Sequence, residues 1–210
     1  TVVWQATGAP TGTVSLSWQA DKTLASGDVH IAVALTPCVT NDWIYEHLIT
    51  NLLPATFYAY EVRVDGHGAG GTFRSAPAED ATKVSFYAFG DTRSNPGAFG
   101  NVIAALQRDM EGHPERHTFI IQSGDLVAKG SEENLWDSDW FMSRSRQGAI
   151  RANMPVMGAP GNHDAGVLYR KYFRMNFPHE KATYNAFNYG PVRIVSLDQN
   201  AWLRAGDRQY

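Results

Sequence analysis

The chain has 210 residues, of which 43% are hydrophobic and 19% are charged, and its formal net charge is −3. This is the composition of an ordinary globular protein with enough residues for one or two domains. The charge and the absence of a basic cluster argue against nucleic acid as a main partner, and the longest apolar runs are shorter than a membrane span requires. The single cysteine, Cys38, excludes an internal disulfide, and we expect a buried thiol there rather than a nucleophile. The chain begins at Thr1 rather than Met, which suggests a processed or trimmed N-terminus.

Residues 1–76 have the pattern of an all-β unit. Residues 14–18 (VSLSW) alternate apolar and polar side chains, and residues 57–64 (FYAYEVRV) are rich in aromatic and β-branched side chains. Weaker strand patterns occupy residues 29–35 and 71–74. Turn residues recur between these segments and no helical periodicity persists, so we expect an antiparallel β-sandwich.

One stretch of this unit resembles a known domain family. Residues 52–58 (LLPATFY) are similar to the L-x-P-x-T-x-Y signature of fibronectin type III domains, and Trp18 and residues 73–77 (FRSAP) fit the same pattern. In that family the tyrosine, here Tyr58, packs at the corner between two strands. The resemblance implies a fibronectin type III-like β-sandwich, and we expect Trp18 and Tyr58 to serve packing rather than chemistry.

Residues 77–82 (PAEDAT) predict a linker because they are small, polar and include a proline. After the linker, strand patterns alternate with helix patterns, which predicts an α/β domain over residues 83–210 with parallel strands and helices on the faces of the sheet. A hairpin is expected around Gly190 and Pro191. On the first helix, one apolar face is expected to contain Val102, Ile103 and Leu106. The expected strands are 83–89, 118–123, 154–158, 182–189 and 192–197, and the expected helices are 97–110, 132–147 and 167–173.

Three of these expected strands end in a glycine-containing turn that carries a side chain able to bind a metal. Ligands of open α/β sheets bind at the carboxyl ends of the strands, so we expect these side chains to lie close together. Carboxylate and amide oxygens with an imidazole suit a hydrolytic centre of Mn, Fe or Zn better than a structural zinc site. A single Gly-Asp after a strand is usually a turn or a helix cap, so it is the succession of three that carries the prediction. The three turns contain Gly90-Asp91, Gly124-Asp125 and Gly161-Asn162-His163-Asp164.

The three turns resemble the first three motifs of calcineurin-like metallophosphoesterases. The preceding β unit makes the purple acid phosphatase branch and its bacterial relatives the most similar group, and residues 193–198 (RIVSLD) resemble the strand that follows the Asn-His motif in that family. The resemblance implies a phosphoric ester hydrolase, a phosphatase or phosphodiesterase, with two metal ions and a metal-bound hydroxide that attacks phosphorus. It also implies an extracellular or periplasmic location.

The roles that this resemblance implies can be carried over residue by residue. Asp91 would bind the first metal ion, Asp125 would bridge both ions, and Asn162 would bind the second. His163 would not be a ligand but would protonate the leaving oxygen or stabilise the phosphoryl charge. The metal ions would be Fe, Mn or Zn.

Two departures from the family pattern lie near these residues. Many relatives have Asp-x-His in the first motif, whereas here Arg93 takes the place of the histidine. An arginine cannot ligate a metal, but it could bind a substrate phosphate with its fork of donors, and a plain surface salt bridge is the alternative. Ala128 stands where purple acid phosphatases have a tyrosine, so the iron–tyrosinate colour is not expected.

A third departure concerns histidines. The family has two later motifs, a lone His and then Gly-His-x-His, and neither occurs before Tyr210. We therefore expect the chain to be the N-terminal portion of a longer enzyme, with a truncated α/β domain and little activity alone. For His113 and His117 we expect solvated loop positions, and the context of His179 predicts a loop.

The sequence is also compatible with two functional classes other than a phosphoric ester hydrolase. A non-catalytic binding or adhesion module with a degenerate phosphoesterase-like domain is the main alternative, and a nucleotide-binding α/β domain is disfavoured because no glycine-rich phosphate loop opens a helix. For the enzyme, the expected partner is a phosphate ester. Phosphomonoesters, phosphodiesters and nucleotides are all left open as substrates, as are the metal and the oligomeric state.

Overall fold

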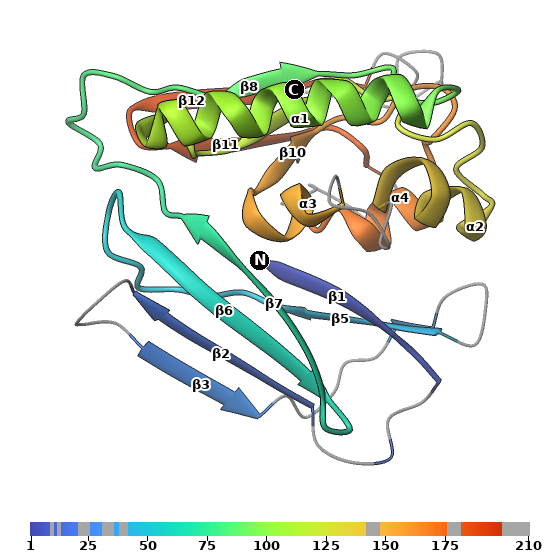
Figure 1. Ribbon diagram of the computed structural model, residues 1–210, viewed down its shortest axis with the longest axis horizontal. Coiled ribbons are helices and arrows are strands. Elements are labelled where there is room, and N and C mark those ends of the chain that lie inside the picture. The colour runs from blue at the N-terminus through green and yellow to red at the C-terminus, as the bar shows by residue number, and fades with distance from the viewer. Residues whose placement is uncertain are drawn as a thin grey trace.

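The computed structural model of the protein describes residues 1–8, 11, 14–20, 26–30, 36–37, 42–141, 148–175 and 182–198. Figure 1 shows two regions, one built of strands from the first part of the chain and one in which helices surround a smaller sheet. Residues 75–86 connect them without forming a helix or strand. The protein is thus a mixture of sheets and helices, and the predicted boundaries at residues 76, 82 and 83 stay predictions.

The first region consists of two antiparallel sheets. One has the strand order β1-β5-β4 and the other has the order β3-β2-β6-β7. Within the second sheet, β6 and β7 form a hairpin around Asp65 and Gly66, whose positive φ values of 49° and 83° close a tight turn. The strands are β1 (Val2–Thr7), β2 (Val14–Ala20), β3 (Ser26–His30), β4 (Thr36–Pro37), β5 (Asp42–His47), β6 (Phe57–Val64) and β7 (His67–Arg74).

Side chains from both sheets enter one apolar cluster. Its buried members include Leu16 on β2 and Val62 on β6, and Trp4 on β1 packs against them. Trp4 also stacks on Tyr45 of β5, with ring centroids 5.4 Å apart. The two sheets therefore share a core. Alternate residues of β2 face this core, which explains the alternation of apolar and polar residues in its sequence.

The strand predictions for this region were right in part. The predicted strands at residues 14–18 and 57–64 are confirmed as β2 and β6. The prediction at residues 71–74 was too short, because β7 pairs with β6 along its whole length from the hairpin turn onward. The weak pattern at residues 29–35 falls on the end of β3 and then outside the described residues, as does Cys38. Strands β1 and β5 had not been predicted.

The second region contains a parallel sheet of the order β10-β9-β8, as the alternation of strands and helices had predicted. The hairpin predicted around Gly190 and Pro191 is also confirmed. Asn185 attaches this hairpin to the sheet, because its Nδ2 donates to the carbonyl oxygen of Gly158 at 3.0 Å. The elements are β8 (Tyr87–Phe89), α1 (Pro96–Gly112), a 3₁₀ turn (Pro114–Arg116), β9 (Ile120–Gln122), α2 (Glu133–Leu135), a π turn (Trp136–Phe141), α3 (Ala149–Asn153), β10 (Val156–Gly158), α4 (Val167–Tyr172), β11 (Asn185–Tyr189) and β12 (Val192–Ser196).

The strands of the parallel sheet are shorter than predicted. The expected strand at residues 83–89 is regular only over β8, since β8 pairs with β9 at just three positions. Before β8 the carbonyl oxygen of Ser85 accepts a hydrogen bond from the hydroxyl of Thr118 at 2.6 Å. A side-chain hydrogen bond thus links the two segments ahead of the regular ladder.

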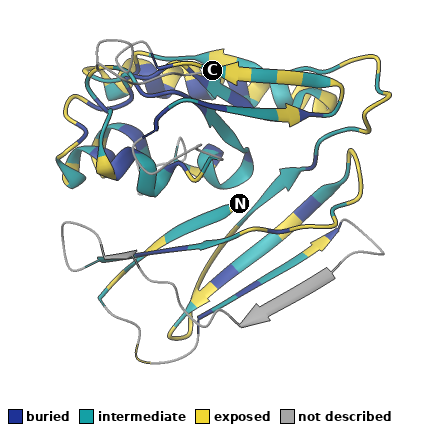
Figure 2. Cartoon of the chain, turned by 180° about the vertical axis from the view of Figure 1, so that it is seen from behind, coloured by how far each residue is buried: buried dark blue, intermediate teal, exposed yellow. Residues whose placement is uncertain are grey.

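Helix α1 has a narrower buried face than expected. Phe99, Ile103 and Leu106 are buried, whereas Val102 is 50% exposed, so its predicted place on the buried face was wrong. Spacings of four and three residues place the buried three on one stripe, and Val102 lies beside it. Figure 2 colours the chain by burial and shows buried positions in both regions.

The helix predicted for residues 132–147 begins as α2 but widens into the π turn after Leu135. The wide turn buries both Trp136 and Trp140 in the core of this region. Residues 142–147 lie outside the described residues, and α3 had not been predicted.

Helix α3 joins the two regions by packing against β7. Oδ1 of Asn153 accepts hydrogen bonds from the amide and the hydroxyl of Thr72, at 2.9 and 3.0 Å. The hydroxyl of Tyr60 donates to the carbonyl oxygen of Ala152 at 2.9 Å. A Cβ at Gly71 would collide with that same carbonyl oxygen. The regions are therefore held together by specific contacts as well as by the chain that connects them.

In the part of the chain that the structure describes, no helix combines the length and apolar character needed to cross a membrane.

Candidate metal centre at the strand ends

The structure brings Asp91 and Asp125 together at one edge of the parallel sheet. Strands β8 and β9 are neighbours with Phe89 opposite Gln122, so the residues that follow leave the sheet side by side. The amide of Asp91 donates to the carbonyl oxygen of Gly124 at 2.8 Å, which extends the strand pairing into the two turns. This is the arrangement expected from the positions of the two motifs.

Both aspartates have a left-handed backbone conformation, with φ values of 53° and 56°. Most residues avoid this conformation, but Asp and Asn tolerate it because their short side chains can bond locally. The preceding glycines are needed for steric reasons. A Cβ on Gly90 would collide with Oγ of Ser123, and Gly124 itself has a φ of 90°. The turns are thus held in an uncommon geometry by close packing.

Arg93 lies between the two carboxylates. Its Nε is 3.1 Å from Oδ2 of Asp125 and 3.4 Å from Oδ1 of Asp91. The side chains of Arg93 and Asp125 are 27% and 17% exposed, whereas that of Asp91 is 80% exposed. The salt bridge considered as an alternative is therefore present, but on its Asp125 side it is largely shielded from water.

The third turn is fastened to the second by Asp164, a residue to which the sequence had assigned no role. The Asp164 carboxylate is fully buried and accepts the amides of Gly161 at 2.6 Å and Leu126 at 2.7 Å. Burial raises the pKa of Asp164, while these backbone hydrogen bonds act in the opposite direction. The contact is tight, because a Cβ on Gly124 would collide with the backbone of Gly161.

His163 is held beside Asp125 with a defined tautomer. Its Nδ1 is 2.8 Å from the carbonyl oxygen of Ala128. A carbonyl only accepts hydrogen bonds, so Nδ1 carries a proton and Nε2 is the nitrogen available for further chemistry. The backbone of His163 is fixed as well, since its amide donates to Oδ1 of Asp125 at 3.2 Å and its carbonyl accepts the amide of Gly130 at 2.8 Å.

Asn162 is exposed on the same turn, next to His163. The other histidines considered earlier do not join this site. His113 pairs with Glu115, and Nε2 of His117 lies 2.6 Å from the carbonyl oxygen of Asn153. His117 also packs edge-on against Phe57 and is half-buried, so it lies in a loop as expected but is only partly solvated. His179 lies outside the described residues.

The side chains at the strand ends fit a metal cation in their donor chemistry. Two carboxylates face a common space that already contains one cationic group, the guanidinium of Arg93. Carboxylate and amide oxygens are suitable ligands for Mn, Fe or Zn. Within the described ranges, no three His, Cys, Asp or Glu side chains form a group that could hold a metal. The ligand roles expected for Asp91, Asp125 and Asn162 therefore stay predictions.

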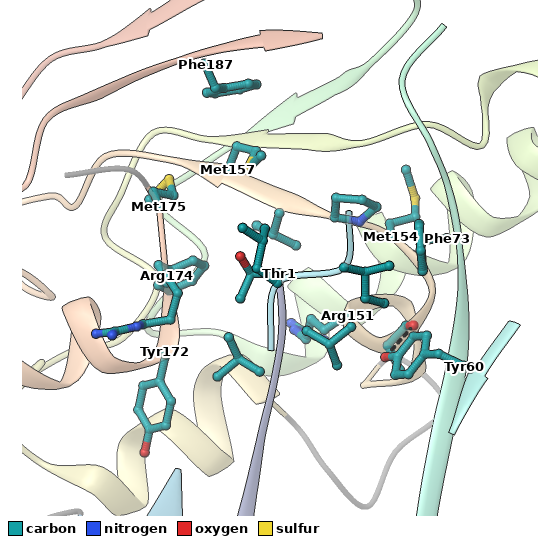
Figure 3. A pocket seen from close by; sticks show the side chains of 18 of the residues that line it. Thr1, Tyr60, Phe73, Arg151, Met154, Met157, Tyr172, Arg174, Met175 and Phe187 are labelled. Carbon is teal, nitrogen blue, oxygen red and sulfur yellow. Dashed lines mark hydrogen bonds between the residues drawn. The ribbon is translucent and has the colours of Figure 1, made fainter. Parts of the chain in front are cut away.

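A cavity of about 430 Å³ lies elsewhere, between the two regions of the protein (Figure 3). Tyr60 and Phe73 line it from the strand region, and Arg151, Met154 and Tyr172 line it from the helical region. The guanidinium of Arg151 also packs on the ring of Trp140, 4.3 Å from its centroid. The cavity is separate from the candidate centre, because its lining does not include Asp91, Asp125, Asn162 or His163.

Comparison with known proteins agrees with the chemistry of the three turns. The sequence model of the calcineurin-like phosphoesterase family matches residues 22–207. The chain is also 28% identical to acid phosphatase type 7 of Danio rerio over 168 residues, which make up 77% of this chain and 35% of that protein. The chain thus spans about a third of the length of this curated relative. From the match over most of its length, we conclude that the chain belongs to the calcineurin-like phosphoesterase family.

Proposed function

We propose that this protein is part of a metal-dependent phosphoric ester hydrolase, and that its centre lies at the ends of β8, β9 and β10. The observation that carries the proposal is the pair of carboxylates, Asp91 and Asp125, on adjacent strand ends with the imidazole of His163 fastened beside them. Membership of the phosphoesterase family supports the same reaction class.

In this proposal Asp91, Asp125 and Asn162 would hold the metal ions on which the family's reaction depends. The ions would supply an activated water and would neutralise charge on the phosphoryl group during in-line displacement. Oδ1 of Asp125 accepts the amide of His163 and Oδ2 is paired with the guanidinium of Arg93, so an ion bound at Oδ2 would replace that guanidinium.

The role proposed for His163 is proton donation to the leaving oxygen. Nδ1 is committed to the carbonyl of Ala128, so a protonated Nε2 can transfer its proton without any change in the position of the ring. Its backbone bonds keep the ring at one site. Arg93 would bind a phosphoryl oxygen through the nitrogens of its guanidinium fork.

We further propose that the strand region is a fibronectin type III-like sandwich and that the enzyme is of the purple acid phosphatase type. The support is the hydroxyl of Tyr58, which accepts the amide of Leu53 at 2.8 Å, as expected for a tyrosine corner. The similarity to an acid phosphatase supports the second part. An extracellular or periplasmic location is proposed on the basis of this similarity to purple acid phosphatases.

The ligand set suggests that residues 1–210 alone turn over substrate slowly. Two carboxylates and an amide, without imidazole ligands from the described residues, give a transition metal few of the donors that it prefers. Weak metal binding with little hydrolysis is therefore expected of this segment, and full activity is expected only of a protein that completes the ligand set. A non-catalytic binding module is the competing proposal.

The test compares two variants in metal binding and in hydrolysis of an aryl phosphate. Asp125→Asn should lose bound Mn²⁺ or Zn²⁺ together with whatever hydrolysis the protein shows. In a protein that completes the ligand set, His163→Asn, whose amide can still donate to the carbonyl oxygen of Ala128, should keep its metal and lower kcat by about 10²- to 10⁴-fold.

The matched control is Asp80→Asn, a change at an exposed aspartate of the connecting segment, which should alter neither property. Metal binding is measured by calorimetric titration with Mn²⁺ or Zn²⁺, because a weakly bound ion would be lost on dialysis. Wild-type metal binding that survives Asp125→Asn, or a His163→Asn protein stripped of metal, would refute the assigned roles. Metal binding with no hydrolysis in a completed chain would favour the binding module.

A further inference from the structure

Arg93 lies between the two carboxylates that are proposed to hold metal. Its Nε contacts Oδ2 of Asp125 at 3.1 Å and is 3.4 Å from Oδ1 of Asp91. The other oxygen of Asp125, Oδ1, accepts the amide of His163 at 3.2 Å. Oδ2 of Asp125 is therefore the oxygen for which a metal and the guanidinium compete.

The backbone around Arg93 keeps it in this position. The amide of Arg93 donates to the carbonyl oxygen of Asp125 at 3.2 Å. Thr92 is buried, and its hydroxyl donates to the carbonyl oxygen of Leu126 at 3.5 Å. Arg93 is thus built into the contact between two turns, unlike an arginine at the end of a solvated loop.

The positive charge of Arg93 affects both the stability of the metal-free centre and its affinity for a metal ion. Without Arg93, the carboxylates of Asp91 and Asp125, which both lie within 3.4 Å of its Nε, would have no positive group between them, which would raise the free energy of the metal-free protein. With Arg93, part of that repulsion is removed before any metal binds. A divalent cation then gains less on binding, because it must replace a charged hydrogen bond that already exists.

We propose that Arg93 is an internal competitor for metal: it stabilises the metal-free centre, lowers the affinity for the ion between Asp91 and Asp125, and is displaced when that ion binds. The displaced guanidinium is then free to bind the phosphoryl oxygens of a substrate. Metal loading and anion recognition are thereby coupled through one side chain. This inference rests on the proposed function, since it requires that the two carboxylates bind a metal.

The test is calorimetric titration of the whole chain with Mn²⁺, comparing the wild type with Arg93→Gln and Arg93→Lys. Arg93→Gln removes the charge and should tighten Mn²⁺ binding at least tenfold, which corresponds to about 1.4 kcal/mol. Arg93→Lys keeps a positive charge and should stay close to the wild type. The matched control is Arg116→Gln, because Arg116 makes an exposed pair with Asp109 at 2.7 Å before β9, at the other end of the strand, and should not affect Mn²⁺ affinity.

A second readout is thermal stability. Metal-free Arg93→Gln should melt below the wild type, and saturating Mn²⁺ should raise its Tm by more than it raises that of the wild type. If Arg93→Gln is unfolded without metal, Mn²⁺ must refold it. Equal Mn²⁺ affinities for wild type and Arg93→Gln, equal tightening in Arg93→Lys, or no refolding by Mn²⁺ would overturn the inference while leaving the proposed function intact. No Mn²⁺ binding by any of these proteins would overturn both.

Discussion

Oδ2 of Asp164 accepts the amide of Leu126 at 2.7 Å, across 38 residues of sequence. Its other oxygen accepts the amide of Gly161 at 2.6 Å. One buried carboxylate therefore joins the turn after β9 to the turn after β10. Because Asp125 and His163 are on these two turns, their relative position depends on Asp164.

The first prediction follows from this contact. Asp164→Asn keeps one acceptor oxygen but places an amide NH₂ against a backbone N–H, which leaves a buried donor unsatisfied. We expect a loss of about 1–3 kcal/mol in the free energy of unfolding, measured by urea denaturation. Asp80→Asn, at an exposed position, is the control and should be neutral. A fully stable Asp164→Asn protein would show that the two turns are held by other contacts.

The second prediction concerns the close approach of Gly124 to Gly161. Gly124→Ala introduces a Cβ at a φ of 90° and directs it into the backbone of Gly161, so it should cost about 2–4 kcal/mol of stability and separate the turns. Gly112→Ala is the matched control, since no atom lies within 4 Å of a Cβ built there. It should change stability by no more than about 1 kcal/mol. Similar losses in both variants would contradict the steric explanation.

The third prediction concerns pH and a cluster remote from the centre. The hydroxyl of Tyr87 donates to Oδ2 of Asp109 at 2.7 Å, and Arg116 pairs with Oδ1. The hydrogen bond from Tyr87, followed by that from Arg116, holds the pKa of Asp109 below its usual range. A carboxyl with a depressed folded pKa adds stability above its unfolded pKa of about 3.9, and this stability is lost as pH falls through the folded pKa.

Tyr87→Phe removes the main cause of this shift, so the pKa of Asp109 should rise toward its usual value. The stability gap between wild type and Tyr87→Phe should therefore be larger at pH 7 than in acid below the folded pKa. Tyr60→Phe is the control, because the Tyr60 hydroxyl donates to a carbonyl oxygen that does not titrate in this range. Denaturation at both pH values and carboxyl NMR titration measure the effect; a gap that is equal at both pH values for Tyr87→Phe would contradict it.

The candidate centre was predictable from sequence to the extent that it depends on strand ends. Asp91 and Asp125 each follow a short apolar run and a glycine, and parallel neighbours end at the same edge of a sheet. Arg93 could not be placed in the same way. Its long side chain can reach water, a substrate or either carboxylate, and only the surrounding charges and backbone decide among them.

Elements whose residues repeat with a clear period, such as β2, β6 and α1, could be predicted from local sequence patterns, together with the turn residues that end them and the order of the three motifs. The pairing of β1 with β5, the packing of α3 on β7 and the burial of Asp164 depend on contacts that appear only in the folded chain. The physical reason is range. Periodicity and turn chemistry act over a few residues. Strand β1, the five-residue helix α3 and the buried carboxylate of Asp164 are instead stabilised by partners that lie far away in the chain.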